Sequence, residues 1–252
     1  MTITNNIKGL IFDYGGTLDS NAYHWSHVLW NGYTTAHIPI NEHQFREAYV
    51  FGERTLAKSE IIKPDDNFYD LLAKKVAIET QYITSQGFWN PSDTELKERQ
   101  KTVVAYSYSI ARNCTQNARK IIEKLIPHYK LALVSNFYGN INAVLRDFEL
   151  DKIFPIIIES AVVGVRKPDP AIFQFGIDAL QLPAEQVITV GDSFDKDIAP
   201  AKKVGCKTIW LKGTAWEEKD VDMSLPNEII TSLDQLSYAI HQIEEKVQKS
   251  SH

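Results

Sequence analysis

Short apolar runs that alternate with helical patterns are the feature that most constrains the fold of this chain. Runs of this length, bounded by glycine or polar residues, are typical of strands buried on both faces of a sheet. There are five: Ile7–Asp13, Lys130–Ser135, Pro155–Ile158, Gln186–Gly191 and Lys207–Leu211. Helical periodicity lies between the later runs, and an amphipathic pattern follows over residues 233–247. The sequence therefore predicts an α/β fold, a Rossmann-like doubly wound parallel sheet with helices on both faces.

The segment between the first two runs has a different pattern. Phe68, Leu72 and Val76 recur at the four-residue spacing of a helix, and Ser92 with Glu95 has the form of a capping box. We therefore expect an inserted α-helical module over residues 19–112. The sheet-forming core then consists of residues 1–18 and 113–252, and short hinges near residues 18–20 and 108–115 join the two parts.

Composition excludes several classes of protein. The 27 Lys and Arg against 32 Asp and Glu give a net charge of −5, which argues against a general nucleic-acid or anionic-membrane binder. The two cysteines, Cys114 and Cys206, are too few and too far apart for a disulfide scaffold or a zinc–thiolate site. No signal peptide and no membrane-spanning run is visible, so we expect a cytoplasmic protein without a membrane partner.

Polar residues follow the predicted strands at the edge where open α/β sheets bind ligands. Asp13, Ser135, Lys167 and the acidic segment 192–197 lie there. Each has a plainer explanation when taken singly, such as a turn aspartate at Asp13 or a helix N-cap at Ser135. Together they offer a nucleophilic carboxylate, a hydroxyl, a cation and ligands for Mg²⁺, which is what phosphoryl transfer to a carboxylate requires.

Four segments in this order resemble the motifs of the haloacid dehalogenase-like (HAD) superfamily. They are Phe12–Leu18, Val134–Asn136, Val165–Pro170 and Gly191–Ile198, each at a predicted strand end. The helical insertion after the first motif is similar to the cap of the type I subfamily. Motifs and insertion together cover about residues 7 to 215.

The resemblance implies a role for each matching residue. Asp13 would form an aspartyl-phosphate, with Lys167 and Ser135 as the other catalytic residues. The phosphate would be held by Ser135, Asn136, Lys167, Gly16 and Thr17. Mg²⁺ would be bound by Asp13, the Gly15 carbonyl, Asp192 and Asp197, the last directly or through water. Asp195 is a second acidic candidate, although the spacing of the family favours Asp197.

One position departs from the pattern of the family. Phosphatases of this superfamily carry a second aspartate, the general acid and base, two residues after the nucleophile. Gly15 occupies that position here, and the pair Gly15-Gly16 predicts a tight turn that needs conformational freedom in φ. The acid is then supplied from elsewhere, or the reaction does not need it, or the site binds without turnover.

The function that the sequence favours is that of a Mg²⁺-dependent phosphatase acting on a small phosphorylated metabolite, with weak activity because the acid is missing. Two other enzymes of the superfamily lack that acid: 2-haloacid dehalogenases, which also lack the acidic metal motif, and phosphonoacetaldehyde hydrolase, which uses a cap lysine. Lys58 is a candidate for such a lysine. A ligand-binding protein without activity is the non-enzyme alternative, and either a monomer or a homodimer fits the sequence.

Overall fold

A single parallel sheet forms the centre of the protein. The computed structural model describes residues 7–214 and 220–249. Its sheet has the strand order β3-β2-β1-β4-β5-β6, and every pair is parallel. The strands are β1 (Gly9–Phe12), β2 (Lys130–Ser135), β3 (Ile156–Glu159), β4 (Val187–Gly191), β5 (Lys207–Leu211) and β6 (Glu228–Ile230). The predicted doubly wound α/β sheet is thus confirmed.

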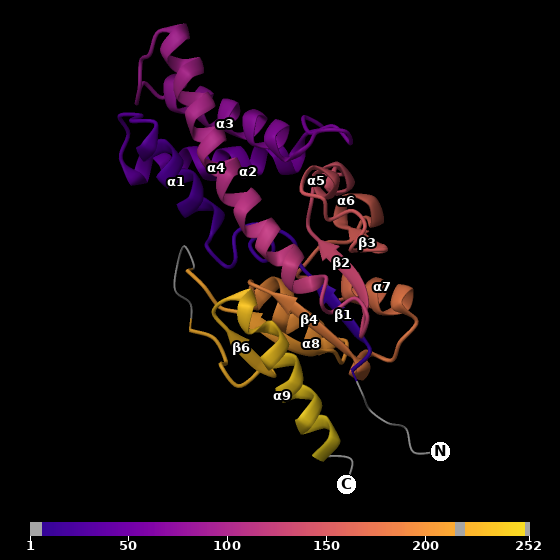
Figure 1. Cartoon of the computed structure of the whole chain (residues 1–252). Helices are drawn as coiled ribbons and strands as arrows, with labels where there is room; N and C mark the ends of the chain where they lie inside the picture. The colour runs from indigo at the N-terminus through magenta and orange to yellow at the C-terminus, as the bar shows by residue number, and fades with distance from the viewer. Residues whose placement is uncertain (1–6, 215–219, 250–252) are drawn as a thin grey trace.

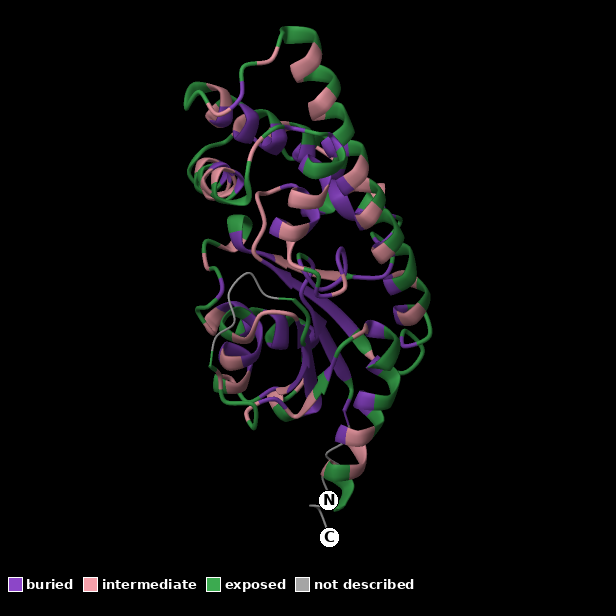
Figure 2. Ribbon diagram, turned by 90° about the vertical axis from the view of Figure 1, so that its left-hand side faces the viewer, coloured by how far each residue is buried: buried purple, intermediate pink, exposed green. Residues whose placement is uncertain are grey.

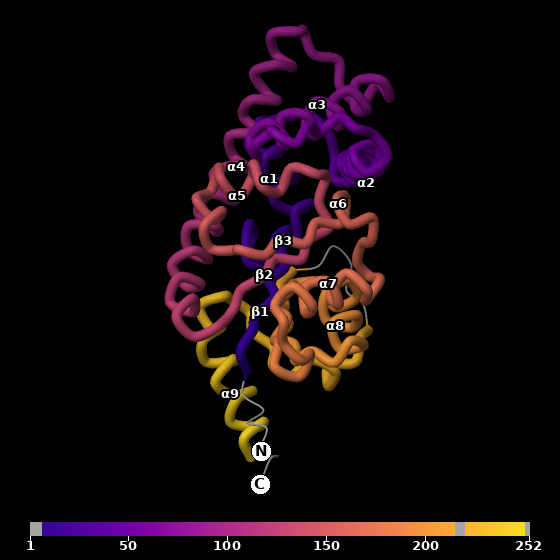
Figure 3. Tube along the Cα trace, turned by 90° about the vertical axis from the view of Figure 1, so that its right-hand side faces the viewer, coloured from indigo at the N-terminus to yellow at the C-terminus, as the bar shows by residue number. Residues whose placement is uncertain are grey.

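Helices cover both faces of the sheet. Side chains alternate along each strand, so Ile11 of β1 faces one helix layer while Leu10 and Phe12 face the other. In Figure 3, α7 (Ala171–Leu180) and α8 (Ala199–Lys203) lie on one side of the strands. The end of α4 and α9 (Leu236–Lys249) lie on the opposite side. Figure 2 shows the strands as a buried layer between these helices.

Two short helices follow strands β2 and β3. They are α5 (Ile141–Asp147), after β2, and α6 (Ser160–Val163), after β3. A π-helical turn over Phe194–Ile198 follows β4 and leads into α8. These connections start at the carboxyl edge of the sheet, which is where the predicted site residues lie.

The helical insertion lies beyond the carboxyl edge of the sheet (Figure 1). It consists of α1 (Trp25–Thr35), α2 (Glu42–Lys58), α3 (Phe68–Ser85) and α4 (Asp93–Ile122). Each begins at a side chain that accepts a hydrogen bond from a first-turn N–H, which replaces a bond that the helix itself cannot make. These N-cap residues are His24, Asn41, Asn67 and Ser92. Asn41 and Asn67 form complete capping boxes.

Aromatic packing joins the insertion to the core. Phe68 at the start of α3 lies 5.4 Å from Phe148 of the core and 6.3 Å from Tyr14, measured between ring centroids. The ring of Trp25 also packs against Phe68, with 5.3 Å between the centroids. The predicted helical residues Phe68, Leu72 and Val76 are all buried. The insertion therefore contributes to one continuous apolar core instead of forming an isolated unit.

Two details differ from the sequence-based expectation. The three-residue strand β6 extends the sheet at its edge and is too short to give a periodic signal. A hinge was expected near residues 108–115, but α4 runs unbroken from Asp93 to Ile122 and carries the chain from the insertion into the core. Within the described residues, no helix is both long and apolar enough to cross a membrane.

Candidate active site

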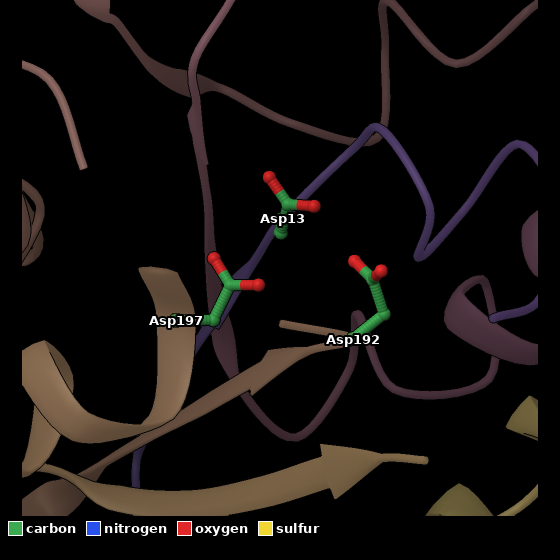
Figure 4. Close-up of side chains that lie close together, drawn as sticks. All are labelled: Asp13, Asp192 and Asp197. Atoms are coloured by element: carbon green, nitrogen blue, oxygen red, sulfur yellow. The ribbon is translucent and has the colours of Figure 1, made fainter. Parts of the chain in front are cut away.

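The four motif segments meet at the carboxyl edge of the sheet. Phe12 of β1 lies opposite Leu133 of β2 and Val190 of β4, so the strands end side by side. Asp13 directly follows β1, and its N–H donates to the Val190 carbonyl at 3.0 Å. Ser135 is the buried last residue of β2. Figure 4 shows that the side chains of Asp13, Asp192 and Asp197 lie close together.

Lys167 links two of these carboxylates. Its ammonium forms an ion pair with Asp13, and its Nζ lies 2.6 Å from Oδ1 of Asp197. The lysine side chain is 3% exposed, so it reaches the site as a buried cation. Asn136 fixes the main chain at this position, since its Nδ2 donates to the Lys167 carbonyl and its Oδ1 accepts from the Lys167 N–H. Asn136 therefore holds Lys167 in place.

Thr17 connects the first motif to the fourth. Its hydroxyl oxygen lies 3.2 Å from Oδ2 of Asp13 and 3.1 Å from Oδ1 of Asp192, and it accepts the Asp192 N–H at 3.0 Å. The indole N–H of Trp210 donates to the Asp192 carbonyl at 2.8 Å. The Asp192 carboxylate is thereby held close to Asp13.

The acidic segment after β4 resolves the choice between Asp195 and Asp197. Asp197 is buried, and its Oδ2 accepts the Ser193 N–H at 2.9 Å. Asp195 is exposed and lies outside the group of three carboxylates. The geometry thus places Asp197, with Asp13 and Asp192, at the candidate site.

The electrostatics of the group favour a bound cation. Oxygen atoms of Asp13, Asp192 and Asp197 lie within 4.8 Å of one another, and Lys167 is the one lysine paired with them in the described residues. Burial raises the pKa of Asp13 to about 6, although Lys167 opposes the shift. Burial and the other two carboxylates hold the pKa of Asp192 well above its usual range. Hard oxygen ligands with surplus negative charge suit Mg²⁺.

The two glycines of the first motif differ in their backbone. Gly16 has φ +94°, and a Cβ there would lie 2.4 Å from Oδ2 of Asp192. Gly15 is not in the positive-φ region, and a Cβ built on it meets no described heavy atom within 4 Å. In the turn expected at this pair, Gly16 is the glycine that adopts positive φ.

Asp19 is a buried acid of this region that the sequence did not single out. Its Oδ1 accepts the Gly16 N–H at 2.7 Å, and its side chain is also hydrogen-bonded to Trp25. Burial raises the pKa of Asp19 to about 7. An acid six residues after Asp13 is the only sequence signal for this role. Asp19 supports the turn that carries Gly16.

The insertion contains a second polar group that sequence reasoning missed. Lys75 of α3 is buried and forms an ion pair with Glu53 of α2. Lys58, the lysine suggested from sequence, is exposed at the end of α2. Neither the pairing nor the burial of Lys75 follows from helical periodicity, because both depend on how α2 packs against α3.

Comparisons with known proteins agree with this fold. The family model of haloacid dehalogenase-like hydrolases matches residues 7–205. Among solved structures, YfnB from Bacillus subtilis, described as a HAD-hydrolase bound to magnesium, superposes with a TM-score of 0.58 at 19% identity, over 93% of this chain and 99% of that one. A HAD phosphatase from Thermococcus onnurineus gives a TM-score of 0.53 at 20% identity, over 94% of this chain and 100% of that one.

Curated relatives match over shorter segments. A glyceraldehyde 3-phosphate phosphatase from Pyrococcus furiosus is 39% identical over 35% of this chain and 37% of its own length. Haloacid dehalogenase-like hydrolase domain-containing protein 3 from Danio rerio is 34% identical over 42% of this chain and 44% of its own length. The matched segments thus span less than half of these relatives. With its α/β fold and the match over residues 7–205, the chain belongs to the haloacid dehalogenase-like hydrolases.

Proposed function

We propose that this protein is a Mg²⁺-dependent phosphatase that hydrolyses a small phosphorylated metabolite through an aspartyl-phosphate at Asp13. The observation that carries the proposal is the position of Asp13, which is paired with the buried cation Lys167 and lies close to the carboxylates of Asp192 and Asp197. Several relatives are named as phosphatases, among them the enzyme from Pyrococcus furiosus, which supports this choice of reaction.

The metal site would consist of the Asp13 and Asp192 carboxylates and the Gly15 carbonyl. Asp197, whose oxygens accept hydrogen bonds from Lys167 and from the Ser193 N–H, would contribute directly or through water. Bound Mg²⁺ supplies positive charge that offsets the phosphate oxygens and the cluster of carboxylates.

In the first step, a carboxylate oxygen of Asp13 attacks the phosphorus atom and the ester oxygen leaves. Lys167, which pairs with Asp13, would hold the phosphate oxygens together with Ser135, Asn136 and the loop at Gly16 and Thr17. The departing alkoxide takes a proton from solvent. In the second step, water attacks the phosphorus, releases inorganic phosphate and restores the Asp13 carboxylate.

Gly15 leaves both steps without the usual side-chain acid and base. The loss of general acid–base catalysis costs roughly 10² to 10⁴ in rate. We therefore propose that turnover is slow for alkyl esters and faster for esters whose leaving group is a stable anion.

We further propose that residues 19–112 act as a cap over a core of residues 1–18 and 113–252. The insertion lies beyond the carboxyl edge of the sheet, and its α2 and α3 pack against Phe137 and Tyr138, which follow β2. A closed cap would limit access of bulk solvent to the site and present side chains to the leaving group, and the water of the second step would enter once the leaving group has departed.

The test is a panel of phosphorylated metabolites, each assayed with and without Mg²⁺. We expect phosphate release that requires Mg²⁺ and is lost in Asp13→Asn. Beryllofluoride, which mimics an aspartyl-phosphate, should bind the wild type and not this variant. Equal binding to both would contradict the assignment of Asp13, and halide release without Mg²⁺ from a haloacid would favour a dehalogenase instead.

A further inference from the structure

Glu53 of α2 is a half-exposed carboxylate with a buried partner. Its side chain is 43% exposed, whereas that of Lys75, with which it forms an ion pair, is 6% exposed. The Lys75 ammonium also lies 3.5 Å from Oε1 of Glu79 and 4.4 Å from the centre of the Tyr49 ring. Glu53 is therefore held by its ion pair with the buried Lys75, while part of its side chain remains exposed to solvent.

Residues packed between α2 and α3 hold this ion pair in position. Glu79 is buried, and its Oε2 accepts the Tyr33 hydroxyl at 3.0 Å. Gly52 makes room for it, since a Cβ on Gly52 would lie 2.9 Å from the Glu79 side chain. Burial alone would raise the pKa of Glu53, but the Lys75 ammonium outweighs it and lowers that pKa. Glu53 is thus a fixed, ionised hydrogen-bond acceptor.

Glu53 lies on the part of α2 that packs against the segment after β2. Its carboxylate interacts with Tyr138, which follows β2, and with Lys196, which follows β4. Tyr138 also packs against the apolar cluster that contains Leu56, one turn further along α2. In the sheet, β1 lies between β2 and β4. The segment of α2 that carries Glu53 therefore packs at the edge of the sheet where Asp13 follows β1.

We propose that Glu53 is a specificity-determining residue, which accepts hydrogen bonds from hydroxyl or ammonium groups on the leaving group of the substrate. This inference rests on the proposed phosphatase function. A phosphoryl group at Asp13 and Lys167 directs the rest of the substrate toward the insertion, where Glu53 is anchored. A carboxylate only accepts hydrogen bonds, and it repels a leaving group that carries another carboxylate.

The experiment compares the wild type with Glu53→Gln on five phosphate esters in the presence of Mg²⁺. Glycerol 3-phosphate carries hydroxyls, phosphoethanolamine an ammonium, propyl phosphate neither, and phosphoglycolate a carboxylate. p-Nitrophenyl phosphate serves as the reference. We expect Glu53→Gln to lower kcat/KM for the preferred donor-bearing ester, relative to the reference, by about ten- to a hundred-fold. The ratio for propyl phosphate should stay within about two-fold.

Two further variants keep the result interpretable. Glu47→Gln on the same helix removes a carboxylate that contacts His43 and the Tyr82 hydroxyl, and it should change no ratio. Glu53→Asp keeps the charge and should retain part of the preference. Which donor-bearing ester is preferred distinguishes a polyol phosphate from an amine phosphate.

Three outcomes would overturn the inference. If the wild type hydrolyses p-nitrophenyl phosphate but Glu53→Gln changes kcat/KM for every ester by the same factor, Glu53 does not bind the leaving group. If the wild type prefers phosphoglycolate, a cation and not Glu53 binds the leaving group, and Lys196, which interacts with Glu53, is a candidate for that cation. If the wild type hydrolyses none of the five esters, the phosphatase function itself fails, and the inference fails with it.

Discussion

Nζ of Lys167 lies 2.6 Å from Oδ1 of Asp197, and both side chains are buried. The same ammonium is paired with Asp13, so one cation touches both the proposed nucleophile and an acid of the fourth motif. Two buried carboxylates on one lysine leave an excess of negative charge, to which Asp192 adds a third carboxylate. This charge balance explains why the site suits a divalent cation.

Replacing Asp192 tests the metal site. Asp192→Asn removes one of three carboxylates that lie within 4.8 Å of one another. We expect Mg²⁺ affinity to fall by at least about ten-fold, because a neutral amide oxygen is a weaker ligand for Mg²⁺ than a carboxylate. Isothermal titration calorimetry on the purified protein measures this directly.

Asp195→Asn is the matched control for that measurement. Asp195 lies three residues further along the chain and carries the same charge, but it is exposed and outside the group. Its replacement should leave Mg²⁺ affinity within about two-fold of the wild type. Equal losses in both variants would mean that the segment attracts the ion only through its net charge.

Gly15→Asp tests the missing acid. A Cβ on Gly15 meets no heavy atom of the described residues within 4 Å, and the residue does not need positive φ, so neither the backbone nor the Cβ opposes the substitution. We expect turnover of alkyl phosphates to rise by about 10² or more, since the variant gains a group that protonates the leaving oxygen. Steady-state kinetics with propyl phosphate and p-nitrophenyl phosphate measure the gain, which should be smaller for the second ester.

Gly15→Asn separates proton transfer from other effects of the side chain. It has nearly the same size as aspartate but no acid, and it should show no gain. A folded Gly15→Asp variant that binds Mg²⁺ without any gain would contradict the proposed ester hydrolysis. Efficient turnover of alkyl phosphates by the wild type would instead mean that another residue supplies the acid.

The sequence predicted those parts of the fold that depend on local pattern. Apolar runs such as Lys130–Ser135 became strands because a strand buried on both faces needs apolar residues throughout. The residues after the strands then had to meet, since parallel strands end at one edge. This reasoning placed Asp13, Lys167 and Asp192 together without any knowledge of side-chain packing.

What the sequence did not predict depends on packing between distant elements. The pairing of Glu53 with Lys75 requires α2 to lie on α3, and the burial of Asp19 requires the insertion to cover the turn after β1. The difference between Gly15 and Gly16 lies in backbone φ, which the residue type alone does not fix. The hinge expected near residues 108–115 falls inside α4, which continues without a break to Ile122.

Asp19 makes the stability of the protein depend on pH. Burial raises its pKa from 3.8 to about 7, so the folded state retains a proton that the unfolded state releases. Its contribution to the free energy of unfolding therefore falls as pH rises from about 4 to 7, by about 4 kcal/mol at most. Asp19→Asn removes this loss and can still accept the Gly16 N–H.

Urea unfolding at pH 4.5 and pH 8 checks this prediction. The free energy of unfolding of Asp19→Asn minus that of the wild type should be larger at pH 8 than at pH 4.5. Asp65→Asn, which replaces an exposed aspartate of the insertion, is the control: it measures how much the loss of one surface charge alone changes stability between the two pH values. A difference between Asp19→Asn and the wild type that is the same at both pH values would show that Asp19 does not titrate in this range.

Phosphorylation of Asp13 is the central claim, and acid-quenched mass spectrometry tests it most directly. The protein is mixed with p-nitrophenyl phosphate and Mg²⁺, quenched in acid during turnover and digested. Because Gly15 offers no base for hydrolysis of the acyl-phosphate, the intermediate should accumulate. We predict one phosphoryl group on the peptide that contains Asp13, and none in Asp13→Asn. Steady release of p-nitrophenol by the wild type with that peptide unmodified, or by Asp13→Asn at an undiminished rate, would contradict the account.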